Sequence, residues 1–206
     1  MGSWRRVVAT AVVLLAASWP ACALADSDAD RRGFVLYGMA GGFAPLSHLD
    51  DAETTNFRTG LSIGGGLAYQ FNRHLALRGT FTFARAEAQV RPGAPGLSAP
   101  LAGARFNRYL YDADLQLRRP FEGGTALYAF VGGGAVTVDQ AVTPGTSSFT
   151  KAAAKLGIGL GYEIPRSNAG LYIEATTWVY DWDRYGFDRR QFDTTWIGGI
   201  LYRFGR

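Results

Sequence analysis

The sequence has very little of the chemistry on which most catalytic and metal sites depend. Its 206 residues include one cysteine, Cys22, and two histidines. Cys22 lies in an N-terminal segment that we expect to be cleaved, so the mature chain would have no thiol and no disulfide bond. We therefore expect no catalytic residues, no cofactor and no metal site.

Long hydrophobic runs are missing after the first 25 residues. Arg5 and Arg6 precede an apolar run, Val7–Ala17, and Ala23-Leu24-Ala25 provides the small-x-small pattern at which signal peptides are cleaved. No later stretch approaches the ~18 apolar residues of a membrane-spanning helix. We divide the chain into a cleaved signal peptide (1–25), a short N-terminal segment (26–32) and one folded domain (33–206).

An excess of charge of one sign is missing as well. The formal net charge of the whole chain is +4, and it falls to about +2 when the two arginines of the signal peptide are removed. Domains that bind nucleic acid usually carry a much stronger basic excess. We expect no nucleic acid among the partners.

What the sequence does contain is period-two alternation. In KAAAKLGIGLGYEIP (151–165), one set of alternate residues is mostly bulky and apolar, and the other contains Lys155, glycines and Glu163. This period indicates a β-strand with two different faces. It recurs along the chain and predicts eight strands, each long enough for the ~9–11 residues of a transmembrane β-strand. The expected strands are Gly33–Pro45, Phe57–Phe71, His74–Ala88, Arg105–Arg118, Thr125–Val138, Lys151–Ile164, Leu171–Trp182 and Phe192–Phe204.

Short and long connections alternate between these strands. The short turns, which are rich in Pro, Gly and Asn, are 72–73, 119–124 and 165–169. The longer and more polar connections are 46–56, 89–104, 139–148 and 183–191. Sorting of this kind is typical of outer-membrane barrels, which have tight periplasmic turns and long outer loops. We therefore predict an all-β fold, an eight-stranded antiparallel up-and-down transmembrane β-barrel.

The polar face of each strand is expected to line the inside of this barrel. Eight strands leave an interior only wide enough for side chains to fill it, and glycines would make room there for charged residues. Leu156, Ile158, Leu160 and Tyr162 would then face lipid. A soluble lipocalin-like barrel would place the bulky apolar set inside, but it has no reason to sort its loops by length.

Several stretches carry a resemblance to a known family. They are GLSIGGGLAYQF (60–71), ALYAFVGGGAV (126–136), KLGIGLGYEIP (155–165), GLYIEATTWVY (170–180) and TWIGGILYRF (195–204). With these the chain resembles the small OmpA/OmpX-like outer-membrane β-barrel family across essentially the whole mature sequence, without the peptidoglycan-binding domain of the longer members. The last stretch looks like the family's C-terminal insertion signal, although Gly205 and Arg206 follow its final phenylalanine. The residues of that signal are Trp196, Ile200, Tyr202 and Phe204.

The resemblance also implies a location and partners. It implies an integral protein of the outer membrane of a Gram-negative bacterium, with residues 26–32 in the periplasm. Outer-membrane lipids and lipopolysaccharide would surround the barrel, and the barrel-assembly machinery and periplasmic chaperones would handle it during biogenesis. We expect a monomer whose loops contact host or surface ligands.

Nine charged residues of inward parity are expected to form a network inside the barrel. Five are expected in the periplasmic half, namely Arg78, Arg118, Glu163, Glu174 and Arg203, and four form a second cluster higher up, namely Arg108, Asp112, Asp114 and Lys155. Glu163 and Glu174 should lie near each other and near Arg203, since an arginine can bridge two carboxylates through its forked donors. The alternative is that water in the lumen solvates each charge separately.

Aromatic residues near strand ends are expected to form the two interfacial girdles of a barrel. These are Tyr69, Phe71, Tyr162, Tyr202 and Phe204 on the periplasmic side, and Tyr109, Tyr111 and Trp196 towards the outside. The 171–182 strand is harder to assign, because the parity that turns Glu174 inwards also turns Trp178 and Tyr180 inwards. A β-bulge near Thr176-Thr177 would resolve this conflict.

Three classes of function remain open. The first is a non-enzymatic surface protein whose barrel anchors four extracellular loops for envelope integrity, surface interaction or adhesion. The second is a narrow pore for ions or small solutes, and the third is an outer-membrane lipid-modifying enzyme. The loop SHLDD (47–51) has residue types found in triads and metal sites, but residues so close in one loop rarely converge as catalysis requires. We favour the first class and expect no enzyme activity.

Overall fold

The computed structural model describes residues 32–47, 55–90, 104–142, 145–183 and 188–204. The expected signal peptide (1–25), nearly all of the 26–32 segment and most of the SHLDD loop lie outside these ranges. Within the described ranges, no helix is both long enough and apolar enough to cross a membrane.

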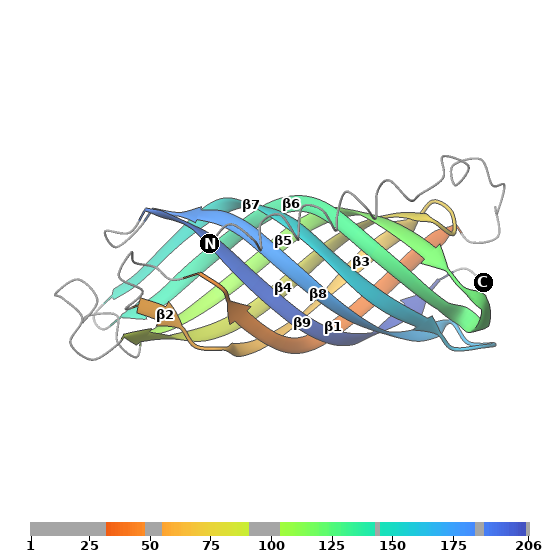
Figure 1. Ribbon diagram of the computed structural model, residues 1–206, viewed down its shortest axis with the longest axis horizontal. Coiled ribbons are helices and arrows are strands. Elements are labelled where there is room, and N and C mark those ends of the chain that lie inside the picture. Colours follow the sequence, from red (N-terminus) through yellow and green to blue (C-terminus); the bar gives the residue numbers. More distant parts are fainter. Residues whose placement is uncertain (1–31, 48–54, 91–103, 143–144, 184–187, 205–206) are drawn as a thin grey trace, which may run out of the picture.

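The described residues form a closed barrel of eight antiparallel strands (Figure 1). The strands are β1 (Gly33–Pro45), β3 (Gly60–Gln70), β4 (Leu75–Val90), β5 (Arg105–Pro120), β6 (Thr125–Val142), β7 (Gly145–Glu163), β8 (Ala169–Trp182) and β9 (Arg189–Arg203). Each strand pairs with the next along the chain, and β9 pairs with β1 to close the sheet. A three-residue strand, β2 (Thr55–Phe57), adds to the outer end of β4. The predicted fold class is confirmed.

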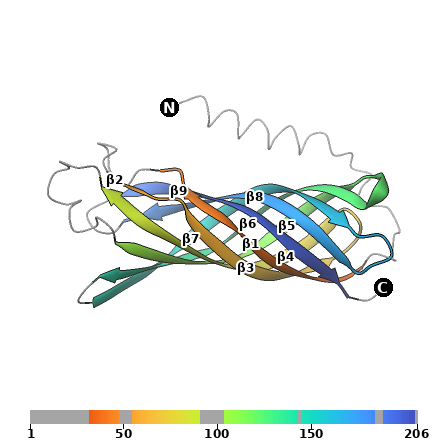
Figure 2. The same cartoon turned by 90° about the horizontal axis from the view of Figure 1, so that it is seen from below.

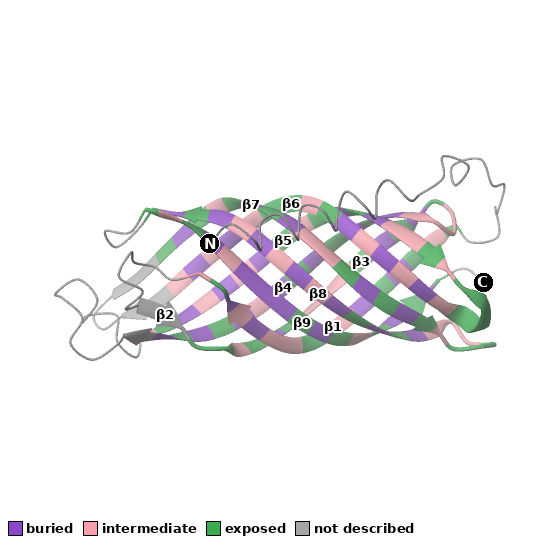
Figure 3. Ribbon diagram, viewed as in Figure 1, coloured by how far each residue is buried: buried purple, intermediate pink, exposed green. Residues whose placement is uncertain are grey.

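Buried and exposed residues alternate along most of each strand, as Figure 3 shows, although Asp193, Thr194 and Thr195 of β9 are all buried. On β7, Lys155 is buried whereas Ile158 and Leu160 are exposed. Exposed apolar side chains on all eight strands form the outer surface, and closure pairs the backbone groups that lipid cannot hydrogen-bond. The polar face is therefore the inside of the barrel, as the glycines and charges of β7 predict.

Directly paired residues form a row that winds around the barrel. Starting at Arg203 of β9, the row passes through Val35, Ala68, Arg78, Asp114, Gly132, Lys155 and Trp178, and it returns to β9 at Asp193. The row returns far from its starting point because the strands of a closed barrel are tilted and staggered. Directly paired residues therefore lie at different distances from the short turns and at different heights in the barrel.

The three short turns lie at the end of the barrel that also holds the C-terminus of β9 (Figure 1). The side chain of Asn72 accepts hydrogen bonds from the backbone N–H groups of His74 and Leu75, at 2.8 and 2.9 Å. In the β5–β6 turn, Gly123 and Gly124 have φ values of 78° and 86°, a conformation that glycine adopts without steric cost. Turn chemistry therefore ends these strands where the sequence predicts.

At the other end, the connection expected at 139–148 is largely strand. Pairing between β6 and β7 continues to Val142 and Gly145, and the hairpin extends well beyond its neighbours at this end of the barrel (Figure 2). The prediction of a loop was wrong here because polar residues above the membrane still form backbone ladders. β9 also begins at Arg189, earlier than the expected Phe192.

The expected bulge in β8 is absent. Pairing with β9 runs without interruption through Thr176 and Thr177, and Glu174, Trp178 and Tyr180 all face inwards. The bulge was predicted on the assumption that bulky aromatic side chains must face lipid. In the structure, the outer part of the interior is an apolar core, where Trp178 is 1% exposed, and the aromatic residues fill it.

Candidate functional site: the barrel interior

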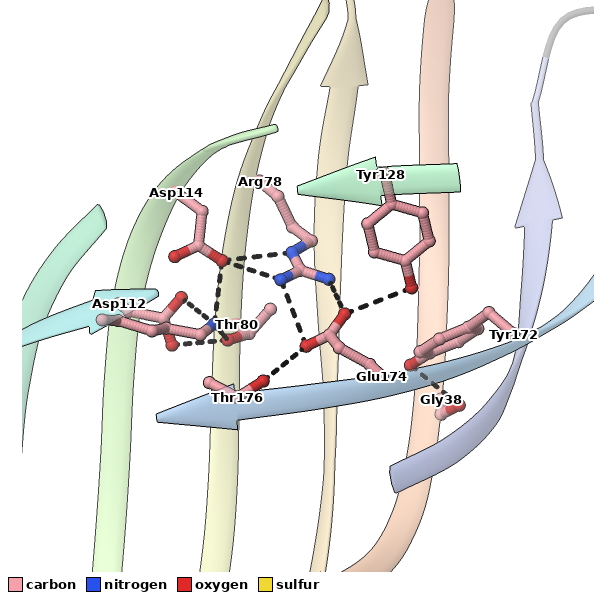
Figure 4. A network of polar contacts seen from close by, with 10 residues as sticks. Gly38, Arg78, Thr80, Asp112, Asp114, Tyr128, Tyr172, Glu174 and Thr176 are labelled. Carbon is pink, nitrogen blue, oxygen red and sulfur yellow. Dashed lines mark hydrogen bonds and ion pairs between the residues drawn. The ribbon is translucent and has the colours of Figure 1, made fainter. Parts of the chain in front are cut away.

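A cluster of buried charges crosses the middle of the barrel (Figure 4). Arg78 of β4 lies between two carboxylates. Its Nη2 is 2.9 Å from Asp114 Oδ2 and its Nη1 is 2.6 Å from Glu174 Oε2. The three side chains are 2%, 0% and 2% exposed. Arg78 therefore bridges two acids through its forked donors, the role that the sequence analysis gave to Arg203.

Lys155 extends this cluster towards β5. Its Nζ is 2.8 Å from Asp112 Oδ1 and 2.8 Å from Asp114 Oδ2, and it donates to Thr80 Oγ1 at 3.1 Å. The hydroxyl of Thr80 in turn donates to Asp112 at 2.5 Å. Asp114 thus receives donors from both cations, and the cluster is one connected network.

Aromatic rings cover the charged groups on one side. The Arg78 Cζ lies 4.4 Å from the centre of the Phe130 ring, and the Lys155 Nζ lies 5.1 Å from it. Tyr128 donates its hydroxyl to Glu174 at 3.3 Å. These contacts add cation–π attraction and exclude water from the ion pairs.

The inward glycines of β7 make room for these rings. A Cβ at Gly157 would lie 2.2 Å from Cζ of Phe130, and a Cβ at Gly159 would lie 2.4 Å from Cζ of Tyr128. From the sequence we expected these glycines to make room for charged side chains. In the structure they accommodate the aromatic side chains that enclose the charges.

A second cluster lies nearer to the short turns. Glu163 Oε1 is 3.1 Å from Nη2 of Arg118 and 2.8 Å from Nη2 of Arg203. Both arginines also donate to the side-chain oxygen of Gln70, at 3.0 and 2.6 Å. One acid and one amide thus hold two arginines together at the end of the barrel with the short turns.

A third cluster lies in the outer half. Arg108 Nε is 3.2 Å from Oδ2 of Asp193, and Tyr180 donates its hydroxyl to the same oxygen at 2.6 Å. The Arg108 guanidinium packs 4.9 Å from the centre of the Phe43 ring. Sequence reasoning missed Asp193, although it has the same inward parity on β9 as Arg203.

The nine predicted charges therefore fall into three clusters instead of two. Glu163 and Glu174 bind different arginines, and Arg78 and Glu174 join Asp112, Asp114 and Lys155 in the middle of the barrel. The predicted grouping was wrong because it placed Arg78 and Glu174 with the strand-end charges. They lie three and five residues from the short-turn ends of β4 and β8, whereas Arg118, Glu163 and Arg203 lie within two residues of theirs. Arg78 is also directly opposite Asp114, on the same row as Lys155, and its long side chain reaches that level.

The residues of the expected insertion signal lie on the outside of β9 and just after it. Trp196, Ile200, Tyr202 and Phe204 are all exposed, and the rings of Tyr202 and Phe204 are 5.0 Å apart. On β3, which β1 separates from β9, the Tyr69 ring contacts Phe34 of β1 and Phe71, at 5.2 and 5.1 Å. These rings form an aromatic group on β9, β1 and β3 at the end with the short turns.

The fold and this outward-apolar, inward-charged arrangement define a small outer-membrane barrel. A model of the outer membrane protein beta-barrel domain matches residues 9–204, and the chain belongs to this family. No curated protein sequence matches the chain.

Among solved structures, Neisserial surface protein A has 14% sequence identity and a TM-score of 0.62, with 84% of this chain and 97% of that chain covered. Ail of Yersinia pestis has 18% identity and a TM-score of 0.49, with 84% and 98% covered. The N-terminal barrel of OprF from Pseudomonas aeruginosa has 12% identity and a TM-score of 0.49, with 84% and 100% covered. The likeness to the neisserial protein supports the barrel fold.

Proposed function

We propose that this protein is a non-enzymatic anchor in the outer membrane, whose closed barrel holds extracellular loops for contact with other surfaces or envelope components. The observation that carries this proposal is the packing of the interior. The central cluster of Arg78, Asp114 and Glu174 fills one level, and Trp178 and Trp182 fill a second level farther out. Packing at two levels favours an anchor over a pore.

The polar groups of the interior also point to one another. The donors of Arg78 and Lys155 are directed to Asp112, Asp114 and Glu174 rather than to the surface. Chemistry on a lipid headgroup would require reactive groups at the outer rim instead. In this account the outer hairpins and loops contact the partners, and the barrel holds them in place.

A loop-replacement variant tests the proposal. The connection between β4 and β5 and the outer part of the β6–β7 hairpin (139–148) would be replaced by short Asn-Gly turns, while the strands within the membrane stay unchanged. The variant should still insert and show the heat-dependent gel mobility of a closed barrel, but cells producing it should lose attachment to surfaces that wild-type cells bind. Equal attachment by the two proteins would contradict the proposal. A change in lipid A mass spectra that depends on the protein would favour a lipid-modifying enzyme instead.

A further inference from the structure

Three exposed arginines lie together on the outward face, at the outer end of β2, β4 and β5. The backbone N–H of Arg58 donates to the carbonyl oxygen of Glu87 at 2.7 Å, and Glu87 is directly opposite Arg105. Arg85 lies two positions from Glu87 on the same face of β4. Adjacent strands are ~5 Å apart and alternate residues ~7 Å apart, so one bound group can reach all three. We call Arg58, Arg85 and Arg105 the arginine patch.

A bulge between β2 and β3 brings the first of these arginines alongside β4. Phe57 pairs with Ala88 whereas Leu61 pairs with Arg85, so the β2–β3 side has one residue more than β4 between these pairs. A Cβ at Gly60 would lie 1.6 Å from the carbonyl oxygen of Arg85, and only glycine permits this approach. The position of Arg58 in the arginine patch therefore depends on this bulge.

A group of aromatic rings lies directly below the arginine patch on the same face. Its members, which we call the aromatic shelf, are Phe81, Phe83, Tyr109 and Tyr111. The ring centres of Phe83 and Tyr109 are 5.4 Å apart, and those of Phe81 and Tyr111 are 6.1 Å apart. The outward side chains of β4 thus change from aromatic to charged at Arg85.

This change occurs at the height expected for the outer membrane surface. At ~3.3 Å per residue along strands tilted by ~40°, Arg85 lies roughly 25 Å above Leu75, which is about the height of the apolar band of an outer-membrane barrel. The aromatic shelf then lies at the upper edge of the acyl chains, and the arginine patch lies at the level of the headgroups.

On the other side of the barrel, cations at this end form ion pairs with carboxylates. On β8 and β9, Arg190 Nε lies 3.0 Å from Asp181 Oδ1, and Lys151 of β7 forms an ion pair with Asp183. By contrast, no carboxylate of the described residues forms an ion pair with any arginine of the patch. Glu87 lies directly opposite Arg105, and Asp139 of β6 lies one diagonal position from Arg105 on the same face. Three arginines against these two acids leave the patch with a net positive charge.

We propose that the arginine patch binds a phosphate of the lipopolysaccharide headgroup while the aromatic shelf packs against the upper acyl chains of the same molecule. The guanidinium fork matches the geometry of a phosphate, and interfacial aromatic rings favour the boundary between headgroup and acyl chain. The site would fix one lipopolysaccharide molecule at β2–β5 and not at β7–β9. The proposal rests on the membrane orientation used in the proposed function.

Binding of purified lipid A to the folded barrel in detergent micelles, measured by native mass spectrometry, tests this site. The variants are Arg85→Gln and the triple Arg58→Gln/Arg85→Gln/Arg105→Gln. Each cation near an anionic membrane surface contributes about fivefold to affinity, so the triple variant should bind bisphosphorylated lipid A roughly a hundredfold more weakly and the single variant about fivefold. Dephosphorylated lipid A should bind wild type as weakly as the phosphorylated form binds the triple variant.

Two matched controls make the result specific. Arg119→Gln removes an exposed arginine from the opposite end of β5, and Arg190→Gln removes one that is already paired. Both should bind like wild type. Equal binding by the triple variant, or equal binding of phosphatidylglycerol and lipid A to wild type, would overturn the assignment. Only protein with heat-dependent gel mobility is compared, so this result is independent of whether the loops contact other surfaces.

Discussion

Arg78 and Glu174 meet across the lumen of the barrel, with 2.6 Å between Nη1 and Oε2. They come from β4 and β8, which are separated by three strands in either direction around the barrel. Backbone pairing therefore does not join these two strands directly. The ion pair is a side-chain brace across the interior, with Asp114 and Lys155 attached to it.

Breaking this brace should destabilise the barrel strongly. Removing one partner of a buried ion pair leaves an uncompensated charge, so Arg78→Met and Glu174→Gln should each cost about 3–5 kcal/mol of unfolding free energy. The double variant should cost much less than the sum, since the two side chains act on each other. Urea unfolding in lipid vesicles, followed by gel mobility, measures all three variants.

The matched control for this cycle pairs Glu174→Gln with Arg203→Met. Arg203 binds Glu163 and Gln70 in the cluster near the short turns, so the effects of this second pair should add within about 0.5 kcal/mol. Additive effects for Arg78 and Glu174 would instead mean that the two charges are stabilised independently.

Gly159 and Gly161 provide a second test, because they share one strand and one face. A Cβ at Gly159 would lie 2.4 Å from the Tyr128 ring, whereas one at Gly161 would lie 3.8 Å from the same ring. Gly159→Ala should therefore destabilise the barrel by about 1–3 kcal/mol through overpacking. Gly161→Ala should be neutral or slightly stabilising in the same urea titration. Equal destabilisation by the two substitutions would show that the Tyr128 ring moves away freely from an added methyl group.

Trp196 and Trp178 should respond differently to the membrane. Trp196 is 63% exposed on the outer surface and Trp178 is buried in the interior. Brominated lipids quench only the indoles that they touch, so the quenching of wild-type protein should disappear in Trp196→Phe and persist in Trp178→Phe. The opposite pattern would mean that the faces of β8 and β9 are exchanged.

The connection between β4 and β5 should be accessible from outside the cell. Residues 91–103 lie outside the described residues, but they join the outer ends of both strands. An epitope inserted after Gly96 should be labelled by antibody on intact cells, because loop tips tolerate insertions. An epitope at the β5–β6 turn serves as the control and should be labelled only after permeabilisation. Labelling of intact cells at the turn alone would invert the topology.

The strands could be predicted from the sequence because lipid imposes a period of two on each of them. β1 has the predicted bounds, Gly33–Pro45, and the turn residues place most other ends close to their predicted positions. The β6–β7 hairpin was predicted too short, since above the membrane no apolar face is required and the alternation ends before the pairing does.

The interior was harder to predict, because the partner of a charge depends on the stagger between strands. Parity correctly indicates that Glu174 and Arg78 face inwards, but only the register shows that Arg78 lies directly opposite Asp114. Asp193 was missed although it lies inside the predicted strand Phe192–Phe204 and shares the inward parity of Arg203. Only the register, which pairs it with Trp178, shows that it lies in the outer half beside Arg108.

If paired charges and aromatic side chains fill the barrel, so that it serves as an anchor, the purified protein should not conduct ions in a planar lipid bilayer. With fluorescently labelled protein counted in the same bilayer, we expect insertion without discrete current steps. Reproducible current steps from inserted wild-type protein would contradict this expectation and would identify the barrel as a pore.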